Sequence, residues 1–116
     1  MPMSARLAPT SLRSNTETDT IMTYPAIVYA HTSVNVATTT TQAIAVNVDR
    51  KFLLLQNISD TAIDIKVGAV AVAGEGIRVY ANGNFEMKPG NGNLNTGAVN
   101  AIHAGAGNKT LLVTEG

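Results

Sequence analysis

The sequence predicts an all-β protein, an antiparallel β-sandwich or jelly roll of roughly seven to nine short strands with an extended N-terminal arm. Three observations predict this fold. Apolar and polar residues alternate with a period of two over much of the chain after residue 24. Threonine, valine and isoleucine are frequent there, and these β-branched residues favour strands over helices. Turn segments rich in Gly, Asn and Asp recur at short spacing between the alternating runs.

Residues 1–23 differ from the rest and are predicted to form the arm, with residues 24–116 as the β-sandwich domain. The arm has two prolines, many small hydroxyl residues and no periodicity. Such a segment cannot bury enough apolar surface to fold alone. Two interpretations remain open. The arm is either a disordered or wrongly assigned leader, with Met22 as an internal start, or an extended arm that lies on a neighbouring subunit.

The first half of the domain is predicted to contain three strands before the main core segment. Residues 26–30 form the first strand and residues 33–37 the second. Residues 42–48 form the third, in which Ile44, Val46 and Val48 share one face of an extended chain.

Residues 50–57 are the most informative segment, because Phe52 to Leu55 are apolar on both faces of a strand. We therefore expect a fully buried strand, in which Leu54→Ala and Leu55→Ala each cost about 2–5 kcal/mol.

A turn at Ser59 to Thr61 leads to a second core segment, residues 63–68, which is apolar on one face only. Its other face carries Asp64 and Lys66, and replacing either of these two residues is expected to cost little. The pattern continues over residues 69–73, which predict a further strand although alanine weakens the signal.

The next segments, residues 77–80 and 84–87, flank an Asn82-Gly83 pair. Because Asn and Gly adopt positive φ at low cost, this pair predicts a tight hairpin. An amide-rich loop follows at residues 91–97. Two more strands are predicted, and they cover residues 98–103 and 109–114.

Composition argues against several functional classes. The 116 residues contain no cysteine, so neither disulfides nor thiolate chemistry is expected. The formal net charge is +0 without any long basic run, which disfavours nucleic-acid binding. No apolar run is long enough to predict a membrane-spanning helix. Charged residues make up 14%, against about 25% in an ordinary soluble domain. A neutral polar surface indicates assembly into something larger, or alternatively a monomer with an uncharged surface.

Candidate catalytic and metal-binding residues are sparse. His31 and His103 lie at predicted strand ends, and nothing at metal-ligand spacing accompanies them. The carboxylates are scattered and are expected to be solvated on the surface. The Gly- and Asn-rich loop at residues 90–93 lacks the helix start of a phosphate loop and the carboxylates of a calcium site. We therefore predict no enzyme, no catalytic residue, no cofactor and no metal.

Several segments together resemble small β-sandwich structural proteins of tailed bacteriophages. The resemblance covers roughly residues 45–116. The segments that carry it are residues 50–57, 63–68, 76–79, 85–87 and 109–116.

The resemblance implies a virion component that is made in the bacterial host cytoplasm and is present in many copies. It would be a head decoration (cement) protein, a head-fibre protein or a neck- or tail-associated protein. The implied partners are the major capsid protein or other virion proteins. The implied assembly is a homo-oligomer, with a trimer favoured. The candidate partner contacts are Ile21, Tyr24, Asn82, Asn84, Asn93 and Asn95.

A different function stays open beside the virion role. The amides of residues 82–84 and 91–96 suit sugar hydroxyls, so the chain is alternatively a carbohydrate- or receptor-binding β-sandwich module. The absence of tryptophan and the 4% aromatic content argue against this alternative.

Overall fold

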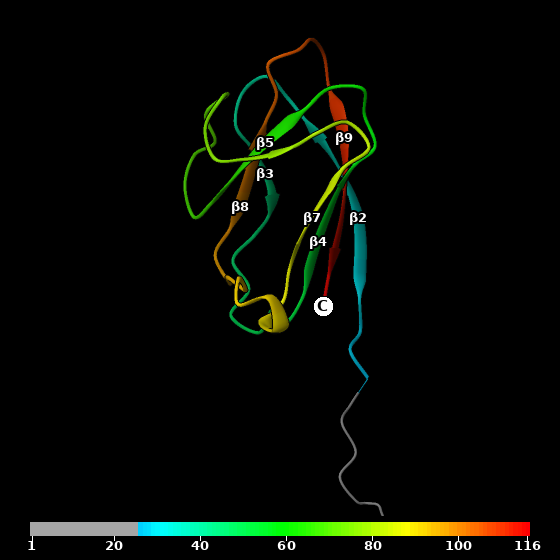
Figure 1. Ribbon diagram of the computed structural model, residues 1–116, viewed down its shortest axis with the longest axis vertical. Helices are drawn as coiled ribbons and strands as arrows, with labels where there is room; N and C mark the ends of the chain where they lie inside the picture. Colours follow the sequence, from blue (N-terminus) through cyan, green and yellow to red (C-terminus); the bar gives the residue numbers. More distant parts are fainter. Residues whose placement is uncertain (1–25) are drawn as a thin grey trace, which may run out of the picture.

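The structure is a computed structural model that describes residues 26–116. The arm predicted at residues 1–23 and the candidate contacts Ile21 and Tyr24 lie outside the described residues. The described residues contain eight strands and one short 3-10 turn. Figure 1 shows how they are arranged. The elements are β2 (Ala30–Val36), β3 (Thr41–Ile44), β4 (Leu53–Asn57), β5 (Ile63–Val67), β6 (Ile77–Val79), β7 (Asn84–Met87), η1 (Pro89–Asn91), β8 (Val99–Ile102) and β9 (Lys109–Glu115).

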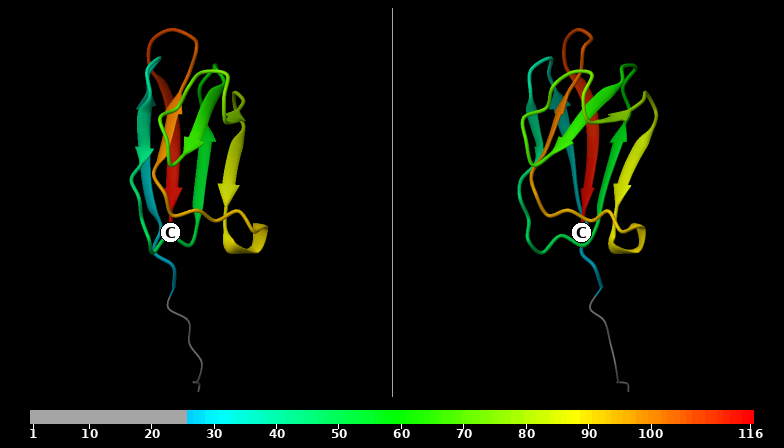
Figure 2. Two further views of the ribbon diagram at one scale, coloured as in Figure 1. Left: turned by 90° about the vertical axis from the view of Figure 1, so that its left-hand side faces the viewer. Right: turned by 60° about the vertical axis from the view of Figure 1, so that its left-hand side comes forward.

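The strands form two antiparallel sheets of four strands each, which pack face to face (Figure 2). The first sheet has the order β2-β9-β4-β7 and the second has the order β3-β8-β5-β6. The chain-order pairs are nested: β5 pairs with β6, β4 with β7, β3 with β8 and β2 with β9. A long hairpin that is rolled into two sheets in this way is a jelly roll. The predicted fold class is confirmed.

The core lies between the two sheets and is built from alternate residues of the strands. Leu53 and Leu55 of β4 face Ile63 and Ile65 of β5 across the sandwich, and all four are fully buried. Because successive side chains of a strand point to opposite faces, these core positions also fix which residues point outward.

The predicted boundaries at the N-terminal side of the domain are wrong in part. Residues 26–29 are not in a strand, and a single strand, β2, runs through Ala30–Val36 where two were predicted. Strand β3 ends at Ile44, four residues before the predicted end. A register irregularity between Gln42 and Ile44 places Ala43 in the core. Val46 and Val48 therefore do not share a buried face; they are 62% and 76% exposed.

Burial of the two central segments also differs from the prediction. In β4, Leu54 is only half-buried, because the outer face of its sheet has no second layer of described residues over it. In β5, Asp64 is 5% exposed where a solvent-facing side chain was predicted, because a loop and an arginine enclose it. Lys66 is half-buried.

The strand predicted at residues 69–73 and the hairpin predicted around Asn82-Gly83 are also wrong. Residues 69–73 form an irregular loop, not a strand. The Asn82-Gly83 turn is present, and Asn82 has φ 62° as expected. It does not close a hairpin, however, because β6 pairs with β5 and β7 pairs with β4. The turn carries the chain from one sheet to the other.

Arg50 is the largest buried polar side chain of the described residues, and its side chain has no exposed surface. Its Nε donates to Glu115 Oε2 at 2.7 Å. Its Nη1 donates to the carbonyls of Asn95 and Gly97, at 2.7 and 2.8 Å. Its Nη2 donates to the carbonyl of Ala45 at 2.8 Å. One guanidinium thus joins the β3–β4 loop, the β7–β8 loop and the end of β9.

We expect Arg50→Met to lower the free energy of unfolding by about 3 kcal/mol or more, because it leaves a carboxylate and three carbonyls without their donor. Lys51→Met changes the exposed neighbouring residue in the same way and should cost less than about 0.5 kcal/mol. Urea unfolding followed by far-ultraviolet circular dichroism measures both. Similar losses for the two variants would contradict the role of Arg50.

The two leucines of β4 separate inward from outward positions. Leu55→Ala should cost about 2–5 kcal/mol, since Leu55 is fully buried in the core. Leu54→Ala should cost less than about 2 kcal/mol, since Leu54 is half-buried on the outer face. The same unfolding experiment compares them, and equal losses would show that the outer face is as tightly packed as the core.

Candidate functional site

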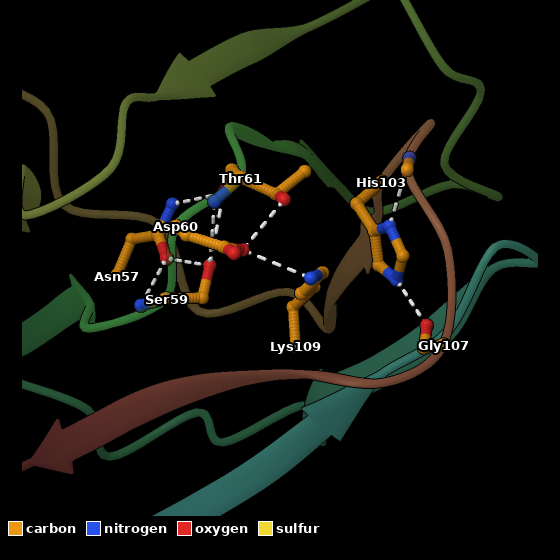
Figure 3. Close-up of polar contacts among 8 residues, drawn as sticks. Asn57, Ser59, Asp60, Thr61, His103, Gly107 and Lys109 are labelled. Carbon is orange, nitrogen blue, oxygen red and sulfur yellow. Dashed lines mark hydrogen bonds and ion pairs between the residues drawn. The ribbon is translucent and has the colours of Figure 1, made fainter.

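A network of hydrogen bonds closes one end of the sandwich, where the β4–β5 turn meets the β8–β9 loop (Figure 3). Asn57 is buried at the end of β4, and its Nδ2 donates to the carbonyls of Thr61 and Val79. Its Oδ1 accepts from the amide and the hydroxyl of Ser59. All the hydrogen-bonding groups of this amide are used, and the bond to Val79 crosses to the other sheet.

Lys109 and Thr61 connect the two loops at this end. Lys109 Nζ lies 2.9 Å from Asp60 Oδ1 (Figure 3). This contact, which is largely a hydrogen bond, holds the pKa of the Asp60 carboxyl below its usual range. A Cβ built on Gly105 would lie 3.1 Å from the Thr61 methyl carbon, so the loops are in close contact.

His103 is buried in the β8–β9 loop, and both nitrogens of its ring bond to the backbone of that loop. The amide of Gly105 donates to its Nδ1 at 3.1 Å, which leaves Nε2 as the donor to the carbonyl of Gly107 at 2.6 Å. Figure 3 shows the ring lying along its own loop. His103 therefore holds the loop in shape.

Ser59, Asp60 and His103 are close together in Figure 3, but their bonds differ from those of a nucleophile and its base. The Ser59 hydroxyl bonds to Asn57 Oδ1 and to the carbonyl of Thr61. Both nitrogens of His103 are bonded to backbone groups. A serine nucleophile requires a direct hydrogen bond to the base, and no such bond joins these two residues. The contacts of these residues connect the β4–β5 turn with the β8–β9 loop.

His31 lies on the exposed edge strand β2 of the first sheet and pairs with Thr114 near the end of β9, whereas His103 follows β8 of the second sheet. The Nδ1 of His31 is 3.0 Å from the hydroxyl oxygen of Thr114, its cross-strand neighbour on β9. The two histidines are thus not brought together. Among residues 26–116, no cluster of three or more His, Asp or Glu residues has the arrangement of a metal site, and no pocket is present. Within the same range, no helix is long and apolar enough to span a bilayer.

The four described candidate contacts do not form one site. Asn82 and Asn84 lie at the start of β7, where Asn84 is opposite Gln56. Asn93 and Asn95 lie beyond the other end of β7. Asn93 Oδ1 accepts from the amide of Lys88 and its Nδ2 donates to a backbone carbonyl, so the side chain holds its own loop. Asn95 Oδ1 likewise accepts from a nearby amide, that of Gly97.

The outer face of the second sheet is covered by residues 68–76, which we call the strap. Figure 1 shows this loop beyond β5 and β8, on the left of the molecule. The amide of Ala71 donates to Thr40 Oγ1 at 3.0 Å, and Asn100 of β8 donates to the carbonyl of Ala69. Ala71 is buried, so the strap packs against the molecule.

Asp64 of β5 fixes the far end of the strap. Its Oδ2 accepts from the amide of Gly74 at 2.7 Å. Both of its oxygens also accept from Arg78 of β6, at 2.8 and 3.1 Å. The hydrogen bonds from Arg78 are the main reason why the pKa of Asp64 is lowered, and they outweigh the burial that acts in the opposite direction. The strap therefore depends on an ionised Asp64.

The outer face of the first sheet, which we call the open face, has no comparable cover from residues 26–116 (Figure 1). The strand alternation defines its ten side chains. They are His31, Ser33 and Asn35 of β2, Thr110, Leu112 and Thr114 of β9, Leu54 and Gln56 of β4, and Asn84 and Glu86 of β7.

Chemically the open face is rich in hydroxyl and amide groups and nearly uncharged. Leu54 and Leu112 are half-buried near its centre, and Glu86 is its only carboxylate, with no lysine or arginine among the ten side chains. At one end the rings of Tyr29 and Phe52 meet edge to face, with centroids 5.5 Å apart. A partner can cover such a face with little desolvation of charge. The open face is our candidate docking surface, and of the predicted contacts it includes Asn84.

Sequence reasoning missed the open face because face assignments depend on strand pairing. It also missed two ion pairs in which one partner is buried, Arg50 with Glu115 and Asp64 with Arg78. The hydrophobic alternation contained the relevant signal, since it indicated which residues of β4 and β5 share a face. Comparison of the chain with protein families, with curated proteins and with solved structures found no match.

The Asp64–Arg78 pair predicts a stability loss in acid. The folded pKa of Asp64 lies below the unfolded value of about 3.9. Its contribution is therefore fully present above about pH 4 and is lost as the pH falls through the folded pKa. Asp64→Asn should cost about 1–3 kcal/mol at pH 7. Its deficit relative to the native chain should shrink below about pH 4.

Urea unfolding at a series of pH values tests this expectation. Glu75→Gln is the matched control, because Glu75 makes an exposed 3.7 Å contact with Lys66, which should contribute less than about 1 kcal/mol. A deficit of Asp64→Asn that stays constant down to pH 2.5 would contradict the assigned ionisation.

Proposed function

We propose that the chain is a non-enzymatic structural component of a tailed-phage virion. In this proposal it is a decoration protein that binds the capsid shell in many copies through the open face. The observation that carries the proposal is the contrast between the two sheets. One outer face is covered by the strap of the chain itself, and the other presents a nearly uncharged surface that no comparable segment of residues 26–116 covers.

The surface chemistry supports a docking role over a soluble binding module. The open face has half-buried leucines at the centre and hydroxyl and amide groups around them. Protein–protein interfaces typically have few charged residues at their centre and polar groups around it. The candidate sugar-binding amides, in contrast, lie at opposite ends of β7, and those of Asn93 and Asn95 bond to their own loops.

The rigidity of both ends also supports this role. Arg50 fixes the loops at one end, and the network around Asn57 and His103 fixes those at the other. A surface that is already ordered loses little conformational entropy when a partner binds. Many copies that each make a modest contact would then stabilise a shell through their sum.

Mass spectrometry of purified virions is the first test, carried out on the phage whose genome encodes the chain. We expect the chain in stoichiometric amounts, with density on the shell in a particle reconstruction. Its absence from virions would end the proposal. Density at the neck or tail would keep the virion role and overturn the shell position.

A binding experiment tests the open face itself. Gln56→Lys places a charge on an exposed position of β4 and should weaken co-sedimentation with undecorated shells at least about tenfold, since burying an unpaired charge costs more than about 1.4 kcal/mol. Val70→Lys is the matched control, because Val70 is exposed on the strap. Binding that is weakened by Val70→Lys and not by Gln56→Lys would assign docking to the other side.

A further inference from the structure

Strand β2 is longer and more regular than the other three edge strands of the described chain. Strands β3, β6 and β7 have three or four residues each. In addition, β3 has a register irregularity, and Pro89 follows β7 closely. Such features protect an edge from pairing with another chain. Strand β2 has seven residues and pairs with β9 in unbroken register, and it contains no proline, lysine, arginine, aspartate or glutamate.

The side of β2 that faces away from β9 pairs with no other described strand. Residues 30–33 are all exposed, and Asn35 is exposed too. Every second backbone amide and carbonyl of an edge strand points away from its partner strand. A long edge in unbroken register, without lysine, arginine or carboxylate side chains, is a template for one more strand.

We propose that a second copy of this chain pairs with this edge, β2 against β2 and antiparallel, about a two-fold axis at Ser33. In this register Ser33 faces its own copy, His31 faces Asn35, and Thr32 faces Val34. These pairs place a hydroxyl beside a hydroxyl, an imidazole beside an amide and a threonine beside a valine, and they contain no like-charged pair. A charged peptide would find no complementary group along β2, whereas the strand is complementary to itself.

The proposed dimer has a geometric consequence for the open face. The two-fold axis of an antiparallel strand pair within one sheet is perpendicular to that sheet. Both copies therefore present their open faces on the same side, as one continuous surface of eight strands. The net charge of +0 adds no long-range repulsion between the copies. The inference concerns free protein and does not depend on the virion role.

Sedimentation velocity of the full chain over a range of concentrations tests the contact. We expect a reversible monomer–dimer equilibrium. Ser33→Lys places two lysines opposite each other at the axis and should raise the dimer dissociation constant at least about tenfold. The position is exposed, so circular dichroism and the unfolding midpoint should stay unchanged. Val70→Lys is the charge-matched control and should dimerise normally.

Cross-linking tests the register independently, since the chain has no cysteine of its own. Ser33→Cys should give a covalent dimer rapidly with a short bismaleimide, because the two side chains meet at the axis. Val70→Cys provides the matched exposed thiol. A monomer at all concentrations, a trimer, or equal cross-linking rates for the two thiols would overturn the proposal.

Discussion

The buried guanidinium of Arg50 is the contact on which the rest of the structure depends. A jelly roll places most of its connections across the two ends of the sandwich, where no strand pairing holds them. At one end, Arg50 supplies donors to three separate segments and neutralises the carboxylate of Glu115. Because these partners are mainly backbone carbonyls, the contact constrains where the loops run.

At the other end the buried polar side chains are Asn57 and His103, and an ion pair between Lys109 and Asp60 lies beside them. Asn57 and His103 each satisfy both of their polar ends with nearby groups, so neither leaves an unpaired group in the interior. Each end therefore has a buried polar anchor that is matched to its carbonyls and amides. The strands between the two ends are held together by the alternate apolar residues that form the core. This division explains how a chain with 14% charged residues maintains a defined shape.

The fold class followed from local alternation, whereas the contacts between distant segments did not. The alternation of β4 and β5 indicated two core strands, and Ile63 and Ile65 confirm the inward face. Asp64 was misassigned because its partner Arg78 lies on β6 and its cover is an irregular loop. Asn82 and Gly83 predicted their turn from backbone preference, but local preference does not specify which sheet receives the next strand. The open face depends on the same non-local pairing.

The position of β9 within the first sheet has a consequence for biosynthesis. It lies between β2 and β4, although it follows all the other described strands in sequence. During translation β2 and β4 therefore emerge long before the strand that joins them. The first sheet can be completed only after residues 109–115 have left the ribosome, and the closing contacts span most of the chain. Such long-range closure is slow, so the nascent protein exposes its apolar strands until synthesis of this segment is finished.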